Sequence, residues 1–242
     1  VKLDGNYPTG TDNVALGNTS LGNVEAGGTN NVAIGDDSLK ALTTGDNNTA
    51  VGYRSLKTAV TSLSNTAIGS LALCTNTGGN NTAIGANAME CNTSGDNNTA
   101  VGKQANFKNT TGASNTSIGN EALKCNTTAS NNTAVGRLSL AANTTGTQNT
   151  AVGFCSLNAN TTGANNVAIG VQALDTNTTA NENVAVGRCS LFSNTEGTKN
   201  IAIGSYSLDT NSTGDSNIAI GYQALDANTT ADNNVAVGDS AL

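Results

Sequence analysis

The stretch Asn132-Thr-Ala-Val-Gly-Arg-Leu-Ser-Leu140, followed by Ala-Ala-Asn-Thr-Thr-Gly146, decides the fold, because close copies of it fill most of this 242-residue chain. From Gly85 onward its glycine returns every 17 residues, and the only other spacings are one step of 18 and one of 16. Such a short, fixed period is typical of a solenoid, in which each repeat packs on its neighbours. We number each repeat from its first Asn, so that this glycine stands at position 5: Gly17, Gly35, Gly52, Gly69, Gly85, Gly102, Gly119, Gly136, Gly153, Gly170, Gly187, Gly204, Gly221 and Gly238.

Composition favours the same kind of fold. Only 11% of the residues are charged and 3% are aromatic, and the chain contains no Trp and no His. So few large side chains cannot build a thick central core, so apolar atoms must be buried in a thin, repeated way. The first repeat begins at Asn13, so we expect residues 1–12 to be a lead-in segment. Because the repeats then continue without a change in composition, we expect 13–242 to be a single solenoid domain.

Seventeen residues are too few for two helices and their turns, but they suit one coil of two short strands and two turns. The unit predicts strands at Thr133–Val135 and Arg137–Leu140, a corner at Gly136 and a second turn at Asn143–Gly146. Successive coils then stack about 4.8 Å apart with like residues in register. The predicted fold class is all-β, a parallel β-solenoid or β-roll of about 14 coils of 17 residues.

Restricted positions predict which side chains are buried. Position 4 (Val135) is Ile or Val in all repeats except that of Leu16, so we expect it in the core with Leu140 of position 9. Burial there would stabilise each coil by roughly 2 kcal/mol. Position 3 is Ala in thirteen repeats and Ser117 in the other, which indicates that something packs closely against it. Both faces of the strand therefore look covered, but a thin roll has one interior and can cover only one of them. We expect other chains in a parallel homotrimer to cover the second face. The alternative is a monomeric β-helix whose interior holds both sets.

Asparagine fills position 1 in all fourteen repeats and position 12 in ten. We expect these side chains to hydrogen-bond along the stack of coils and to cap turn backbone. Many also match Asn-x-Ser/Thr, as the repeat itself dictates, and glycosylation is the alternative reading for Asn126, Asn143, Asn160, Asn177 and Asn228.

Residues that could carry chemistry are few, and the sequence predicts no enzyme, no cofactor and no metal site. Without His, the usual general base and the commonest metal ligand are missing. Asp46, Asp96 and Asp215 lie in turns, and only Asp209 and Asp226, one coil apart, approach the arrangement of a glycosidase pair. We favour solvated turns for all of them, and we assign no catalytic, cofactor-binding, metal or ligand-binding residue.

The five cysteines show no clear pairing. Cys91 and Cys125 are two coils apart, as are Cys155 and Cys189, and that separation of about 9–10 Å exceeds what a disulfide spans. Cys74 and Cys91 lie on adjacent coils and are the one conceivable pair, but the odd number favours free thiols.

Recognition must use the positions that vary, chiefly 6 and 7 after the glycine. These carry Tyr53, Arg54, Arg137, Phe154, Arg188, Tyr206 and Tyr222, while position 10 carries Phe107 and Phe192. Exposed rings can stack on sugars, although single exposed apolar side chains are common on protein surfaces. The net charge of −7 without a basic patch argues against nucleic acid, and no apolar run approaches the roughly 18 residues of a membrane span.

The pattern Asn-x-Ala-[Ile/Val]-Gly-x-x-[Ser/Ala] resembles the repeat of the trimeric autotransporter adhesin head, a left-handed parallel β-roll that trimerises. The longer form, Asn217-Ile-Ala-Ile-Gly-Tyr-Gln-Ala-Leu225 followed by Asp-Ala-Asn-Thr-Thr230, is more similar to repeats of phage and giant-virus tail-fibre proteins. The resemblance covers about 13–242, although the adhesin unit is usually shorter. It implies a non-catalytic fibre segment at a virion surface that presents a host-recognition surface. The implied partners are its own copies, other virion proteins, and a host glycan or receptor.

Three other functions compete with the viral fibre. A bacterial trimeric adhesin head would lie outside the cell, at its surface. An ice-binding β-solenoid would use threonine ladders such as Thr127, Thr144, Thr161 and Thr178, although these lie in turns. A polysaccharide-degrading tailspike needs a carboxylate cleft that 17-residue coils barely offer.

Overall fold

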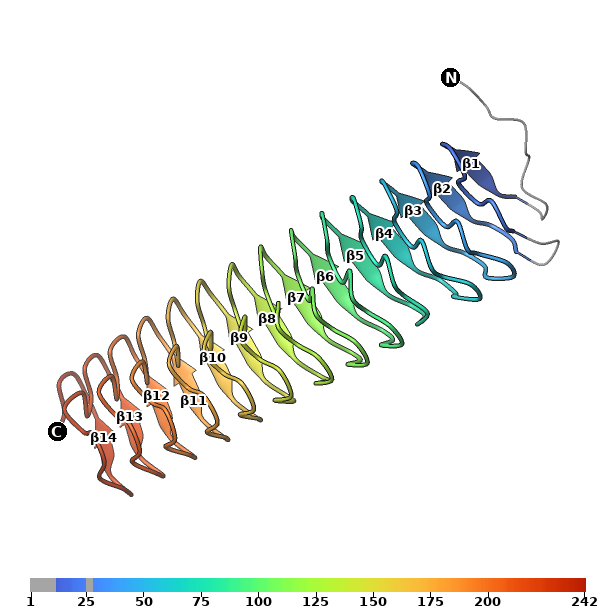
Figure 1. Cartoon of the computed structure of the whole chain (residues 1–242). Coiled ribbons are helices and arrows are strands. Elements are labelled where there is room, and N and C mark those ends of the chain that lie inside the picture. The colour runs from blue at the N-terminus through green and yellow to red at the C-terminus, as the bar shows by residue number, and fades with distance from the viewer. Residues whose placement is uncertain (1–11, 25–27) are drawn as a thin grey trace. The chain divides into compact units, whose positions relative to one another are not determined.

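The computed structural model describes residues 12–24 and 28–242, so nearly all of the predicted lead-in, 1–12, lies outside the described residues. The described part contains fourteen three-residue strands, one per repeat, and no helix. It divides into two compact units, unit 1 (Val1–Asn115) and unit 2 (Thr116–Leu242), and each forms a parallel β-solenoid (Figure 1). The prediction of an all-β parallel solenoid with about 14 coils of 17 residues is confirmed.

Consecutive strands pair in parallel and in register within each unit, so that Ala134 lies opposite Ala151 and Val135 opposite Val152. Unit 1 contains β1 (Val14–Leu16), β2 (Val32–Ile34), β3 (Thr49–Val51), β4 (Thr66–Ile68), β5 (Thr82–Ile84) and β6 (Thr99–Val101). Unit 2 contains β7 (Thr116–Ile118), β8 (Thr133–Val135), β9 (Thr150–Val152), β10 (Val167–Ile169), β11 (Val184–Val186), β12 (Ile201–Ile203), β13 (Ile218–Ile220) and β14 (Val235–Val237).

The second predicted strand, Arg137–Leu140, is wrong. This segment is a series of turns in which Leu138 and Leu140 adopt left-handed backbone conformations, with φ of 59° and 53°. Ser139 and Leu140 are both fully buried, whereas successive side chains of a strand point to opposite faces. The left-handed residues let two neighbouring side chains enter the same interior, which an extended chain cannot do.

The predicted burial of the first strand is reversed. Ala134 of position 3 is fully buried inside the coil, while Val135 of position 4 points outward and is only partly buried. Isoleucines at position 4 are more exposed still, as at Ile203, which is 40% exposed. Leu140 enters the interior from the opposite wall and packs in the same cluster as Ala134, so the space left beside the strand admits only a small side chain. The alternative in which one interior holds both sets is therefore wrong as well.

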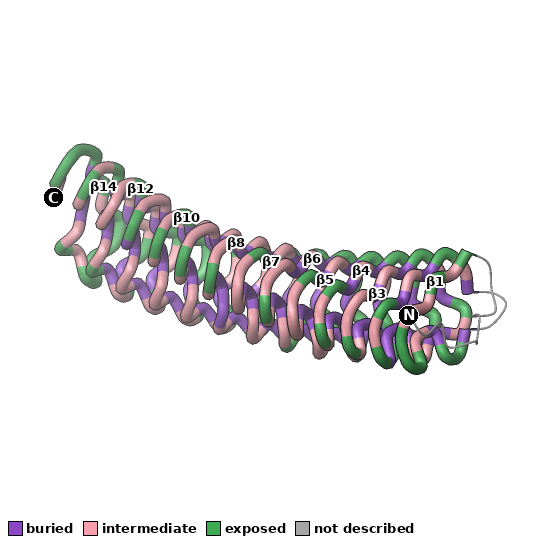
Figure 2. Tube along the Cα trace, turned by 90° about the horizontal axis from the view of Figure 1, so that it is seen from above, coloured by how far each residue is buried: buried purple, intermediate pink, exposed green. Residues whose placement is uncertain are grey.

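The interior is thin and built from columns of like residues. Leu of position 9 and Ala of position 3 form the apolar columns, and each fully buried Leu contributes about 2 kcal/mol. Position 8 is small, and where it is Ser, as at Ser139, its hydroxyl donates to the carbonyl of Gly136 at 2.9 Å. Figure 2 shows the result, in which buried, intermediate and exposed stretches alternate around the coils of each unit.

Two ladders of buried asparagines complete the interior, as the sequence predicts. The backbone N–H of Asn149 donates to Oδ1 of Asn132 in the preceding coil at 2.9 Å, and the backbone N–H of Asn166 donates to Oδ1 of Asn149 at 3.0 Å. In the second ladder, Nδ2 of Asn160 donates to Oδ1 of Asn143 at 2.8 Å. Where both ladders are present they meet within the coil: Nδ2 of Asn132 and Nδ2 of Asn143 donate to the same Gly146 carbonyl, at 2.9 and 3.0 Å.

The first three coils of unit 1 fill the position-12 column differently. Val24, Leu42 and Ala59 stand there in place of Asn, and all three are buried. An apolar residue of suitable size therefore replaces the second ladder, while the position-1 ladder continues from Asn13 to Asn31 at 2.8 Å.

One interior position breaks the pattern. Asn106 occupies the leucine column of unit 1, is fully buried, and neither its Oδ1 nor its Nδ2 has a hydrogen-bond partner among the described residues. The apolar cluster of unit 1 ends at Ala105, one residue earlier, and the cluster of unit 2 begins at Ala122. An unsatisfied buried amide costs about 1–3 kcal/mol, so Asn106 is a weak point in the core.

We expect Gly136→Ala to lower the free energy of unfolding by about 3 kcal/mol. Gly136 has a φ of 134°, and an added Cβ would fall on the carbonyl group of Gly153 in the next coil. Gly79→Ala is the control, with an expected loss of about 1 kcal/mol, because its φ is not left-handed and an added Cβ would come no closer to a neighbouring atom than 3.3 Å, at the Leu63 carbonyl oxygen. Urea denaturation followed by circular dichroism measures both. Equal losses would contradict the assigned role of position 5.

We expect Asn106→Leu to raise the free energy of unfolding by about 2 kcal/mol, since it removes two unsatisfied polar atoms and restores the leucine column. Leu adopts the required left-handed backbone throughout this column, as at Leu56 with a φ of 49°. The reciprocal change, Leu56→Asn, should destabilise the chain by about 3 kcal/mol. Thermal and urea unfolding test both variants, and an Asn106→Leu protein that is less stable than the wild type would show that Asn106 has a partner.

Candidate functional site

The outer face of the strands carries the same residue types in nearly every coil of each unit. Positions 2 and 4 both point outward, and the isoleucines of position 4 are about two-fifths exposed: Ile34, Ile68, Ile84, Ile118, Ile169, Ile203 and Ile220. In-register stacking joins these side chains into one apolar column in unit 1 and another in unit 2. Monomeric proteins rarely expose large continuous apolar patches, and those that occur often mark interaction sites. We call this surface the strand face.

The chemistry of the strand face changes along the chain at position 2. Thr occupies this position from β3 to β9, beside Ile or Val at position 4. From β10 to β14 both outward positions are Val or Ile, for example Ile201 and Ile203 in β12. The second half of unit 2 is therefore the longest stretch of the strand face in which both outward positions are apolar; in unit 1 only β1 and β2 share this feature.

Positions 6 and 7 form the corner after the glycine, where the sequence predicts variation. All three arginines of the chain lie here, and each guanidinium stands over an aromatic ring. Arg54 lies 4.8 Å from the ring centre of Tyr53. The other two arginines pair with rings of the following coil, a contact that the sequence alone does not reveal.

A cluster of charges surrounds Asp37 in unit 1. Its carboxylate accepts hydrogen bonds from Lys40 Nζ at 2.8 Å and Thr19 Oγ1 at 2.5 Å, and Arg54 Nε and Lys57 Nζ lie 3.6 Å away. The Lys40 and Thr19 bonds hold the pKa of Asp37 far below its usual value. The folded state therefore gains stability from this carboxylate above its usual pKa and loses it as the pH falls. This cluster braces adjacent coils through its ion pairs, although Arg54 Nε has no hydrogen-bond partner among the described residues, and sequence reasoning missed it.

The acidic residues predicted in turns have structural roles there. Asp46 accepts from the Thr29 amide at 2.7 Å, and Asp215 accepts from the Thr198 amide at 2.6 Å, so each carboxylate ties its turn to the preceding coil. Asp96 does the same for Gly79 at 2.7 Å.

Asp209 and Asp226, the conceivable glycosidase pair, occupy the same position of adjacent coils. Partial burial and then the neighbouring Asp226 charge raise the pKa of Asp209. Both carboxylates stand at position 10 of their coils, and this pair alone does not make a catalytic site. We assign no function to either residue.

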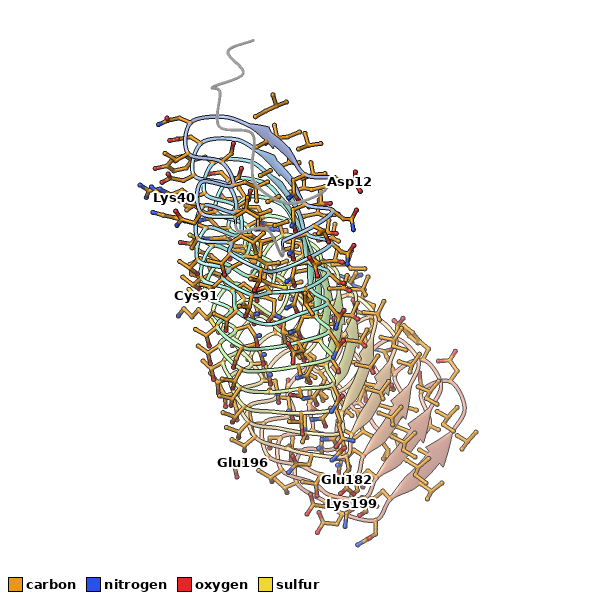
Figure 3. All side chains as sticks on the ribbon, turned by 90° about the vertical axis from the view of Figure 1, so that its right-hand side faces the viewer. Asp12, Lys40, Cys91, Glu182, Glu196 and Lys199 are labelled. Atoms are coloured by element: carbon orange, nitrogen blue, oxygen red, sulfur yellow. The ribbon has the colours of Figure 1, made fainter. Side chains whose placement is uncertain are left out.

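All five cysteines are free thiols, which agrees with the sequence prediction. Burial raises the pKa values of Cys74, Cys91 and Cys155, which disfavours the reactive thiolate. Lys40 and Cys91 project from the side of the unit 1 coils away from the strands, as Figure 3 shows. Four of the five are partly buried and Cys189 is buried.

The asparagines of the Asn-x-Ser/Thr matches belong to the second ladder. Asn126, Asn143, Asn160 and Asn177 are fully buried, and Asn228 is partly buried. In Asn143, Asn160, Asn177 and Asn228 the Nδ2 atom that a glycan would modify is a ladder donor, as from Asn177 to Asn160 at 2.8 Å. In Asn126 the same atom donates to the Ala129 carbonyl at 3.0 Å. A glycan at these positions would break the ladder.

Within the described part of the chain, no group of three or more Cys, Asp or Glu residues is arranged to hold a metal ion. No helix there is long and apolar enough to cross a membrane. A scan against protein-family models finds no match, and searches of curated proteins and of solved structures find none either. Functional inference therefore depends on the surfaces of the coil.

Proposed function

We propose that this chain is a non-catalytic segment of an extended fibre, built from parallel copies that associate through the strand face. The observation that carries the proposal is the outward column of Ile and Val at position 4. Burying these side chains against identical columns would contribute about 25 cal/mol per Å² of apolar surface. A second copy suits this face because its repeat has the same pitch and the same in-register apolar side chains.

A parallel homotrimer is the assembly we favour. Closed cyclic symmetry leaves no apolar strand face open, whereas an open arrangement would continue to grow. The resemblance of the repeat to trimeric fibre proteins supports three copies. The more apolar half, β10 to β14, would then hold the copies together most firmly, since both outward positions are Val or Ile.

The fibre is proposed to stand at a virion surface, joined to other virion proteins and presenting its outer corners to a host glycan or receptor. A bacterial trimeric adhesin head is the alternative and would use the same coil and the same strand face. In both settings the repeated residues build the scaffold, and the varied residues at positions 6 and 7 are available for recognition.

An ice-binding function is a second candidate, favoured by the threonines of position 2. Thr49, Thr66 and Thr82 lie on the flat outer face of β3, β4 and β5, beside Val or Ile of position 4. The turn ladder considered from the sequence is less suitable, because Thr127 Oγ1 and Thr144 Oγ1 donate to carbonyls of the following coils, both at 3.0 Å.

Light scattering tests the assembly. We expect the wild type to have three times the 24.0 kDa mass of the chain and the double variant Ile169→Lys/Ile203→Lys to be monomeric, because two buried charges per copy would oppose the contact. Thr145→Lys adds a charge on an exposed turn and should leave the mass unchanged. A monomeric wild type would refute the proposed association.

Thermal hysteresis of the purified protein tests the second candidate. Both functions use the strand face, so we expect a trimeric protein to show no hysteresis. A monomer whose hysteresis is lost in Thr66→Lys/Thr82→Lys would instead establish ice binding. The same variants of a trimeric protein should only weaken its assembly.

A further inference from the structure

Positions 6 and 7 of the six consecutive coils from Asn132 to Asn217 form a surface that we call the corner strip. It contains two arginines and three aromatic residues but no Asp or Glu, although acidic residues outnumber basic ones in the chain by 17 to 10. It follows the glycine of position 5 and therefore lies beyond the strand face. It consists of the two residues that follow this glycine in each of the six coils, among them Arg137, Phe154, Val171, Arg188, Tyr206 and Tyr222.

The two arginines of the corner strip are oriented by aromatic rings. Arg137 Cζ lies 5.6 Å from the ring centre of Phe154, and Arg188 Cζ lies 5.5 Å from that of Tyr206. Tyr206 in turn meets Tyr222 edge to face, with ring centres 6.2 Å apart. A guanidinium stacked on a ring keeps its N–H edges available, and these match a carboxylate in a bidentate way.

Both arginines lack an acidic partner in the part of the chain that the structure describes. The salt bridges there involve Asp37 in unit 1 and Glu121 with Lys124 in unit 2. The corner strip therefore presents two exposed positive groups, Arg137 and Arg188, on an acidic chain. Such groups favour an anionic ligand.

Between and beside the arginines, the corner strip carries exposed apolar side chains. Phe154 is 42% exposed, Val171 43% and Tyr222 50%. The in-register stacking of β8 to β13 repeats the corner about every 4.8 Å, so the strip extends over about 24 Å in five steps. Arg137 and Arg188 are three coils apart, or about 14 Å. A surface with this repeat fits a linear polymer lying along the strip.

We propose that the corner strip binds a linear polysaccharide that carries carboxylate groups. Phe154 and Tyr222 would pack against the apolar C–H faces of sugar rings, and Arg137 and Arg188 would bind carboxylates. This inference rests on the proposed function and deepens it, because it names the ligand class that a receptor-facing fibre would recognise.

Single-stranded nucleic acid is the other polymer that stacks on aromatic rings, and the charges disfavour it. Every nucleotide carries a phosphate, and binding grooves for nucleic acid line the backbone with many cations. The corner strip offers two cations in a chain of net charge −7. Sparse carboxylates on a sugar polymer match this charge density better.

The test is binding of the full chain to an array of uronate- and sialate-bearing glycans, printed beside the same glycans with each carboxylate reduced to an alcohol. We expect binding to carboxylated glycans, at least tenfold weaker binding to their reduced forms, and weakening with added salt. Arg137→Gln/Arg188→Gln and Phe154→Ala/Tyr222→Ala should each lose tenfold or more. Arg54→Gln is the matched control, because it removes the same type of arginine–ring contact outside the corner strip and should leave binding unchanged.

Light scattering and thermal melting of the same variants separate this inference from the proposed assembly. We expect the two double variants to keep the mass and melting temperature of the wild type, since they leave the strand face intact. Arg54→Gln should also keep the mass, but it should melt slightly lower because it loses the ion pair with Asp37. Absence of binding to every carboxylated glycan would overturn the proposal, as would equal binding to the reduced glycans or unchanged binding in both double variants. Stronger retention of single-stranded oligonucleotides than of the carboxylated glycans would overturn it in favour of nucleic acid.

Discussion

The convergence of two asparagine side chains on one carbonyl is the interaction on which most coils depend. Asn132 opens the coil and Asn143 stands near its end, and both amides donate to the Gly146 carbonyl. Each side chain is also linked to the neighbouring coil, so one set of groups closes the coil and joins it to the next. Buried amides are costly when unpaired, and therefore this arrangement tolerates little change in the residue or in the spacing.

The thin interior follows from these ladders and explains the composition. Small Ala and Ser side chains, one Leu and two Asn fill a coil, so aromatic residues have no place inside. The larger Ile and Val of the strand then face outward, opposite to their usual location. A chain that buries its smallest residues and exposes an apolar face is suited to assembly with its own copies, and this links the core to the proposed fibre function.

Much of the fold could be predicted from the sequence, because the same residue types recur at the same positions and give each coil the same local structure. The 17-residue period, the three-residue strand, the glycine corner and the asparagine ladders all follow from residue types at fixed positions. The sequence did not reveal which face of the strand lies inside. Alternation places positions 2 and 4 opposite position 3, but it does not identify the buried face. The strict limit to Ala at position 3 was the signal, since it marks the narrower space. The left-handed backbone at Leu138 and Leu140 had no signal, because Leu rarely adopts it.

For the candidate surfaces, the sequence predicted where variable residues lie but not which side chains contact one another. Variation at positions 6 and 7 located the corner, but the pairing of Arg137 with Phe154 depends on the register of neighbouring coils. The Asp37 cluster likewise joins residues of different coils, and single residues gave no indication of it. The sequence argument placed position 3 on the outward face of the strand and expected other chains to cover it there, whereas the side chains that face outward are those of positions 2 and 4.

Hydrogen exchange of asparagine side-chain amides, followed by NMR, tests the central claim most directly. Side-chain amides in solvent exchange rapidly, whereas buried and bonded ones exchange only when the structure opens. The account predicts slow exchange for the Nδ2 protons of Asn132, Asn143, Asn149 and Asn160, with Asn131, which is exposed, as the fast internal reference. Exchange of the ladder amides as fast as that of Asn131 would contradict the claim that these bonds hold the coils together.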